Sequence, residues 1–128
     1  MAYPTGRALE RYRALQVGTA DPAQLLLLLY EGALRFLGQA EQALAAQRSW
    51  QAHDSLVRAE KILEELLDTL DPSKDPKLAQ DLGRLYDYCW RRLLEADLRA
   101  DAGPIREVAA LLRNLLEGWR QVIAPRSP

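Results

Sequence analysis

Residues that commonly carry catalysis are scarce in this sequence. It contains a single histidine, His53, a single cysteine, Cys89, and neither a P-loop nor a glycine-rich dinucleotide motif. One histidine cannot supply a His-rich metal site or the paired Glu-x-x-His motifs of a di-iron bundle, and one cysteine cannot supply a zinc site. Glu64 and Glu65 are adjacent, but adjacent helix positions point in different directions, so they do not predict a paired acid. We therefore expect no enzymatic activity, no metal site and no cofactor.

His53 is the residue on which an alternative function would depend. A helical bundle with one exposed histidine can be a phosphotransfer signalling domain, whose imidazole needs a nearby cation to stabilise the phosphoryl group. Here the following residue is acidic, Asp54, and the next cation along the chain is Arg58. This arrangement favours a surface histidine near Ser49 and leaves phosphotransfer as the runner-up.

Composition and charge exclude several other classes of function. The 17 Lys and Arg residues are balanced by 18 Asp and Glu residues, so the positive field that a nucleic-acid binder needs is missing. A lone cysteine forms no intramolecular disulfide, and the apolar neighbours of Cys89 predict a buried thiol. Residues 1–6 lack the apolar stretch of a signal peptide, and the longest apolar run, residues 25–30, is too short to span a bilayer. We expect a soluble cytoplasmic protein that is not inserted in a membrane.

Helix start and stop signals divide the chain into four long segments. Asp21-Pro22 and Asp75-Pro76 each place an N-capping side chain before a proline at the first helical position. Ser49 is a third expected cap, and Gly103-Pro104 interrupts the chain before the last segment. The expected helices span residues 22–47, 49–70, 76–98 and 104–123.

Short connections make successive helices antiparallel neighbours. No segment has the sustained period-two alternation of a strand. We therefore predict one all-α domain over residues 1–128. It consists of an antiparallel up-down-up-down four-helix bundle (residues 21–123), a short N-terminal helical cap (residues 3–17) and a frayed tail (residues 124–128).

The apolar pattern predicts which helix faces are buried. In the last three helices a single apolar stripe recurs at helical spacing, so Leu63, Leu85 and Leu112 are expected in the core. The first helix differs, because residues 25–30 are five leucines and a tyrosine and are apolar on all sides. Its surplus apolar residues must pack under neighbouring helices or be covered by the N-terminal segment or a partner. In this helix we expect Leu25, Leu29, Phe36 and Ala40 to face the core, and Leu26, Leu27, Tyr30, Leu34 and Leu37 to lie off that face.

Several blocks of the sequence share a pattern with one protein family. The opening of the first long helix contains the blocks Thr19-Ala20-Asp21-Pro22, Gln24-Leu25 and Leu29-Tyr30-Glu31-Gly32-Ala33, preceded by Tyr12 and Val17. The third helix contains the blocks Leu85-Tyr86-Asp87-Tyr88, Arg91-Arg92-Leu93 and Glu95-Ala96-Asp97, and Trp119 follows near the end of the chain. Together these blocks resemble the FliS family of flagellar export chaperones over nearly the whole chain. The chain departs from that pattern at Asp21, Cys89, Trp90 and Asp97, and none of these departures removes a type of contact.

The resemblance implies a function as well as a fold. FliS proteins bind the disordered C-terminal segment of flagellin in apolar surface grooves, prevent its premature polymerisation and deliver it for type III flagellar secretion from the bacterial cytosol. Other flagellar regulatory or export proteins are further possible partners, and the chain is expected to be a monomer or a weak homodimer. A generic bundle that oligomerises through its leucine-rich face stays open as an alternative. The residues expected to contact flagellin are Leu26, Leu27, Tyr30, Leu34, Tyr86 and Tyr88.

Residues 3–17 are expected to form a displaceable N-terminal cap. Leu9, Tyr12 and Leu15 recur three apart and can share one helix face, and Val17 extends the apolar segment. The segment is too short to be a stable helix by itself, so it must dock on the bundle or stay disordered. Docking on the helix that follows directly costs little closure entropy, and a docked cap competes with the client.

Removing the cap is therefore expected to change client binding. A chain that starts near Ala20 should bind the C-terminal segment of flagellin more tightly, or associate with it faster, than the full chain, because no cap must first be displaced. Surface-immobilised binding kinetics measure both quantities. Weaker binding would mean that Tyr12 itself contacts the client, and unchanged rate and affinity would show that residues 3–17 are inert.

Overall fold

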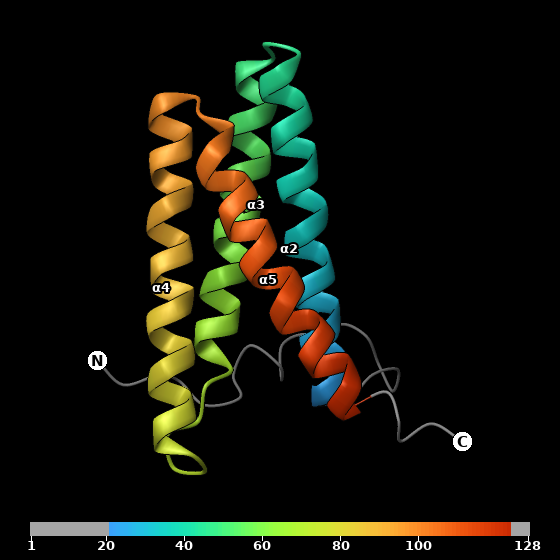
Figure 1. Ribbon diagram of the computed structural model, residues 1–128, viewed down its shortest axis with the longest axis vertical. Coiled ribbons are helices and arrows are strands. Elements are labelled where there is room, and N and C mark those ends of the chain that lie inside the picture. The colour runs from blue at the N-terminus through green and yellow to red at the C-terminus, as the bar shows by residue number, and fades with distance from the viewer. Residues whose placement is uncertain (1–20, 124–128) are drawn as a thin grey trace.

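The computed structural model describes residues 21–123, which form four helices and contain no strand. The helices are α2 (Pro22–Ala45), α3 (Ser49–Asp68), α4 (Pro76–Arg99) and α5 (Ala102–Ile123) (Figure 1). They run alternately up and down as an antiparallel bundle, which confirms the predicted fold class, and their ends fall within a few residues of the expected ones. The expected cap at residues 3–17 and the tail at 124–128 lie outside the described residues.

Two of the three expected caps are present. The Asp21 carboxylate accepts a hydrogen bond from the backbone N–H of Gln24 at 2.8 Å, and Asp75 accepts one from Leu78 at 3.1 Å. Each cap satisfies an amide that has no partner within its helix. The prediction for Ser49 was wrong: it is the first residue of α3, and Arg48 precedes it without a side-chain cap.

Each helix packs against its neighbours in sequence, and α5 closes the ring by packing against α2. Figure 1 shows α5 beginning beside α4 and crossing the bundle, so that it ends beside α2 and away from the start of α4. Ion pairs join α5 to both of its neighbours, and Arg106 near its start already binds Glu41 on α2 at 2.7 Å. Arg92 on α4 binds Glu107 at 2.7 Å, whereas Arg120 near the end of α5 binds Glu31 on α2 at 3.0 Å. The crossing therefore leaves α4 and α5 splayed at one end of the bundle.

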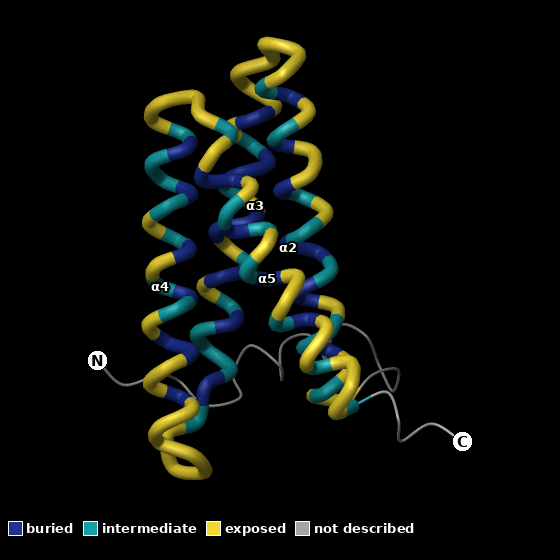
Figure 2. The backbone as a smooth tube through the Cα atoms, viewed as in Figure 1, coloured by how far each residue is buried: buried dark blue, intermediate teal, exposed yellow. Residues whose placement is uncertain are grey.

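The buried residues line the inside of the ring, as Figure 2 shows. Leu63 and Leu112 are fully buried and Cys89 is a buried free thiol, as expected. Phe36 and Leu85 were expected in the core and are only half-buried against it.

The predicted orientation of α2 was partly wrong. Tyr30 and Leu37 were expected off the core face but are 0% and 1% exposed. Leu25, Leu29 and Ala40 are buried as expected. Because the apolar run gives α2 no polar side near its start, packing against the other helices decides which of its residues point inward.

The α3–α4 interface contains polar groups beside the core. Nδ1 of His53 lies 2.6 Å from Asp97, and the indole N–H of Trp90 donates to Glu64 at 3.2 Å. Glu60 is only 8% exposed, and its Oε2 has no hydrogen-bond partner within residues 21–123. Burial raises the pKa of Glu60 to about 7, helped by the nearby Asp97 and Glu64 carboxylates and opposed by His53.

This buried carboxyl predicts a pH-dependent stability. Between the ordinary pKa of about 4.5 and the folded-state pKa of about 7, the folded chain binds more protons than the unfolded chain. The free energy of unfolding should therefore fall as pH rises through that window. Glu60→Gln removes the titration, so the variant should gain stability relative to the parent between pH 5 and pH 8, measured by urea unfolding.

Glu117→Gln is the matched control, because Glu117 is exposed on α5. Its stability difference from the parent should not change between the two pH values. An equal stability difference for Glu60→Gln at pH 5 and pH 8 would contradict the assignment of the titrating group.

Candidate functional site

A buried tyrosine pair joins the two helices that face each other diagonally across the bundle. The hydroxyl oxygens of Tyr30 on α2 and Tyr86 on α4 lie 2.6 Å apart, and either can donate the hydrogen bond. The rings meet edge-on, with centroids 6.3 Å apart, and the two residues are 0% and 1% exposed. Burial raises the pKa of both hydroxyls, so both stay protonated near neutral pH. Each hydroxyl thereby satisfies the other inside an apolar core.

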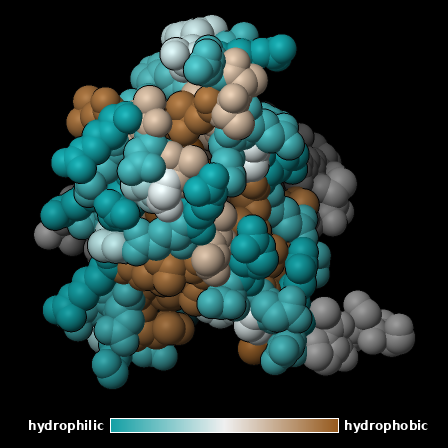
Figure 3. Space-filling view, turned by 45° about the horizontal axis from the view of Figure 1, so that its top comes forward, coloured by the Kyte–Doolittle hydropathy of each residue, from teal (hydrophilic) through white to brown (hydrophobic). Residues whose placement is uncertain are grey.

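A groove opens beside this pair, where α4 and α5 splay apart. This α4–α5 groove has a volume of about 210 Å³, and its lining comes from α2, α4, α5 and the α3–α4 connection. Tyr86 lies in its wall, and the exposed Leu78 stands at its edge. Figure 3 shows hydrophobic atoms gathered between polar surfaces on this side of the molecule. The apolar lining residues are Leu26, Leu70, Leu78, Ala79, Leu82, Tyr86 and Trp119.

Polar groups are also available at the groove. The indole nitrogen of Trp119 is buried beside the Tyr30 hydroxyl, so it is not presented to the groove. The rim carries Asp71, Lys74 and Asp75 from the α3–α4 connection. An apolar wall with a few polar groups at the edge is suited to holding apolar side chains of a peptide and bonding to its backbone.

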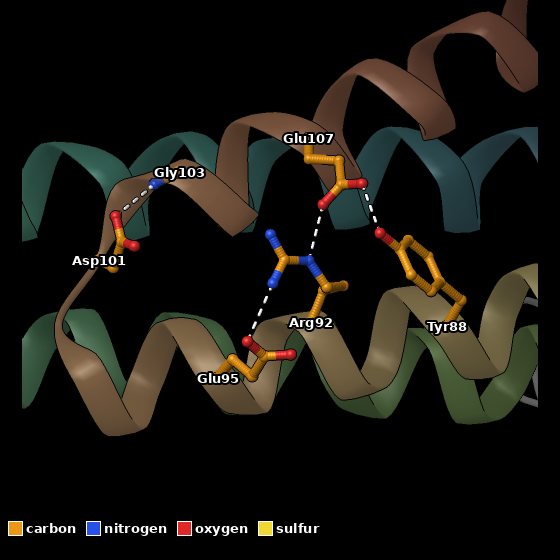
Figure 4. A network of polar contacts seen from close by, with 6 residues as sticks. All are labelled: Tyr88, Arg92, Glu95, Asp101, Gly103 and Glu107. Carbon is orange, nitrogen blue, oxygen red and sulfur yellow. Dashed lines mark hydrogen bonds and ion pairs between the residues drawn. The ribbon is translucent and has the colours of Figure 1, made fainter.

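Closer to the α4–α5 turn, a polar network ties the two helices together (Figure 4). Glu107 accepts hydrogen bonds from the Tyr88 hydroxyl at 2.5 Å and from Arg92 Nε at 2.7 Å, and Arg92 also binds Glu95 at 3.0 Å. The hydrogen bond from Tyr88 and the Arg92 guanidinium lower the pKa of Glu107. The network therefore holds α4 and α5 together near the turn that connects them, and the two helices separate farther from that turn.

The six residues expected to contact a client do not form one surface. Leu26 is half-buried and lines the α4–α5 groove. Leu27 and Leu34 are half-buried and lie one turn to either side of Glu31, which pairs with Arg120 of α5, so they lie toward the α2–α5 interface. Tyr88 is 43% exposed, but its hydroxyl is engaged by Glu107.

Tyr30 and Tyr86 support the groove from within the core rather than standing on the surface. A charged residue in place of Tyr30 would put an unpaired charge inside the core, so it would test folding rather than client contact. Leu70, Leu78, Leu82 and Trp119 also line this groove, and the sequence patterns did not predict that they come together. Their grouping depends on the path of α5, which no single-helix pattern contains.

Residues 21–123 contain neither a membrane-spanning helix nor a metal-binding cluster. None of the four helices is long and apolar enough to cross a membrane. The same residues contain no cluster of three or more His, Cys, Asp or Glu side chains that could hold a metal ion.

Comparison with known proteins identifies the family. The family model "Flagellar protein FliS" matches residues 5–126. The chain belongs to the FliS family. It is 34% identical to the flagellar secretion chaperone FliS of Bacillus subtilis over 112 residues, covering 88% of this chain and 83% of that protein. It is 39% identical to the flagellar secretion chaperone FliS of Salmonella typhimurium over 107 residues, covering 83% and 79%.

A solved structure has the same fold. The crystal structure of a flagellar chaperone from bacteria superposes with a TM-score of 0.77 at 22% identity, covering 94% of this chain and 98% of that one. FliS proteins are chaperones and not enzymes, so the chain is a flagellar secretion chaperone without catalytic activity. The expected family and the expected lack of enzymatic function are thereby confirmed.

The tyrosine pair is expected to behave as one energetic unit. Tyr30→Phe or Tyr86→Phe alone leaves the other hydroxyl buried without a partner and should lower the free energy of unfolding by about 1–3 kcal/mol. The double variant should cost less than the sum of the single variants, because it leaves no orphaned hydroxyl. Urea unfolding of the four proteins measures this coupling.

Tyr88→Phe serves as the control, since it removes a hydroxyl from an exposed side chain. It breaks the hydrogen bond to Glu107, but water can replace the lost partner at an exposed side chain, so it should cost less than either buried substitution. Additive costs for Tyr30→Phe and Tyr86→Phe would argue against the bond between them.

Proposed function

We propose that the protein binds the C-terminal segment of flagellin in the α4–α5 groove, prevents it from polymerising and delivers it for type III flagellar secretion. The observation that carries this proposal is an open apolar groove that draws its lining from α2, α4, α5 and the α3–α4 connection. The relatives named as flagellar secretion chaperones support the same conclusion. The site of action in this proposal is the bacterial cytosol, where the client awaits export.

The chemistry of the groove is suited to a client segment without structure of its own. A disordered segment exposes apolar side chains and unpaired backbone groups, and it orders as it binds. Leu78 and Leu82 offer apolar contact, and Lys74 at the rim offers a donor to a backbone carbonyl. Covering the apolar side chains of the client removes the surface through which copies would associate.

The remaining parts of the proposal concern regulation and assembly. Residues 3–17 compete with the client for the bundle, through Leu9, Tyr12, Leu15 and Val17. Leu27, Leu34 and Tyr88 contribute contacts beyond the groove, where the client segment continues over the α2–α5 and α4–α5 sides. The chain acts as a monomer or weak homodimer and can receive other flagellar regulatory or export proteins.

Leu78→Gln is expected to weaken binding of the flagellin C-terminal segment about tenfold or more, because it places an amide at the exposed edge of an apolar contact. Fluorescence anisotropy with a labelled segment measures the affinity. Leu98→Gln is the matched control, since Leu98 is 87% exposed near the other end of the same helix.

Both variants should keep the helical circular dichroism and unfolding midpoint of the parent. His53→Gln should also bind normally, because a chaperone function does not require a phosphoryl-accepting histidine. Equal affinities for the Leu78→Gln and Leu98→Gln variants would remove the α4–α5 groove from the proposal. Failure of the parent protein to bind flagellin would contradict the proposed function itself.

A further inference from the structure

A second groove runs along the outside of helices α2 and α3. This α2–α3 groove has a volume of about 440 Å³ and shares no described lining residue with the α4–α5 groove. Gly32 lies within it where the helices approach closely: a Cβ at this position would stand 3.3 Å from Ile62 Cδ1. The floor is apolar and includes Leu28, which is 48% exposed, and the half-buried Phe36 and Ile62. A solvent-exposed apolar floor of this kind needs an explanation.

Cations stand along both sides of the floor. Arg35 comes from α2, and Arg58 and Lys61 come from α3, and all three are exposed. The guanidinium carbons of Arg35 and Arg58 lie 5.6 Å and 5.8 Å from the centre of the Phe36 ring. Cation–π attraction therefore holds both guanidinium groups over the floor rather than leaving them free in solvent.

The rim keeps a net positive charge. Arg35 and Lys61 form no ion pair within residues 21–123, whereas Arg58 pairs with Asp54 at 3.0 Å. Glu31 is the one acidic residue in the described lining, and its carboxylate is bound by Arg120 of α5 at 3.0 Å. The groove therefore combines an apolar floor with cations whose charge is not balanced locally.

We propose that the α2–α3 groove is a docking site for an acidic amphipathic helix of a partner protein, separate from the client segment in the α4–α5 groove. Apolar side chains one turn apart seat on Leu28, Phe36 and Ile62, while carboxylates on the flanks of the partner helix pair with Arg35 and Lys61. The floor follows α2 from Leu25 to Phe36, a rise of about 16 Å, so the partner helix contributes about three turns.

Two synthetic helical peptides of about 14 residues test this site. Both carry leucines at i, i+4, i+7 and i+11; one has Glu on both flanks of that stripe, and its twin has Lys at the same positions. The acidic peptide should bind the full chain and the Lys twin should not, as measured by fluorescence anisotropy. Raising NaCl from about 0.05 M to about 0.5 M should weaken binding several-fold, because salt screens the rim charges.

Substitutions assign the binding to the α2–α3 groove. Arg35→Glu with Lys61→Glu should weaken binding of the acidic peptide about tenfold or more, mainly through a slower association rate. Arg84→Glu with Arg113→Glu is the matched control, since both residues are exposed on α4 and α5 and form no ion pair within residues 21–123. Leu28→Gln should also weaken binding, whereas Leu98→Gln should not.

Three outcomes would overturn the proposal. The first is equal binding of the acidic and Lys peptides, or no binding of either. The second is self-association of the chain that the Arg35→Glu, Lys61→Glu double variant abolishes, which would assign the groove to a second copy. The third is loss of flagellin-segment binding in that double variant, which would assign it to the client.

Discussion

The Tyr30–Tyr86 hydrogen bond constrains the rest of the bundle. Helices α2 and α4 face each other across the core without backbone contact, so only side chains fix their relative height. Both hydroxyls are buried, so sliding one helix along the other would break their hydrogen bond inside the core. Since Tyr86 also forms part of the α4–α5 groove, the same bond sets the position of the groove wall.

Much of the fold follows from local signals. Asp21-Pro22 and Asp75-Pro76 fix two helix starts, because a capping carboxylate and a preset proline dihedral act within one turn. The orientation of α2 does not follow in this way. Its run of leucines is apolar on every side, and the choice of Leu37 over Phe36 for the interior depends on the shapes of three other helices.

The residues of the candidate site were harder to predict from the sequence, for a related reason. Leu26 lines the α4–α5 groove, whereas Tyr30 and Tyr86 are interior residues. This groove lies where α4 and α5 diverge, as α5 crosses toward α2 and Arg120 pairs with Glu31. Apolar spacing within one helix carries no information about crossing angles between helices.

The four-part lining of the α4–α5 groove has a thermodynamic consequence. Leu26, Leu70, Leu82 and Trp119 belong to different parts of the chain, so a ligand that contacts all of them can bind only when the whole bundle is folded. By mass action, such a ligand at about 100 times its dissociation constant adds about 2.7 kcal/mol to the free energy of unfolding. The chaperone with bound client is then harder to unfold than the free chaperone, and release of the client returns the chain to its less stable form.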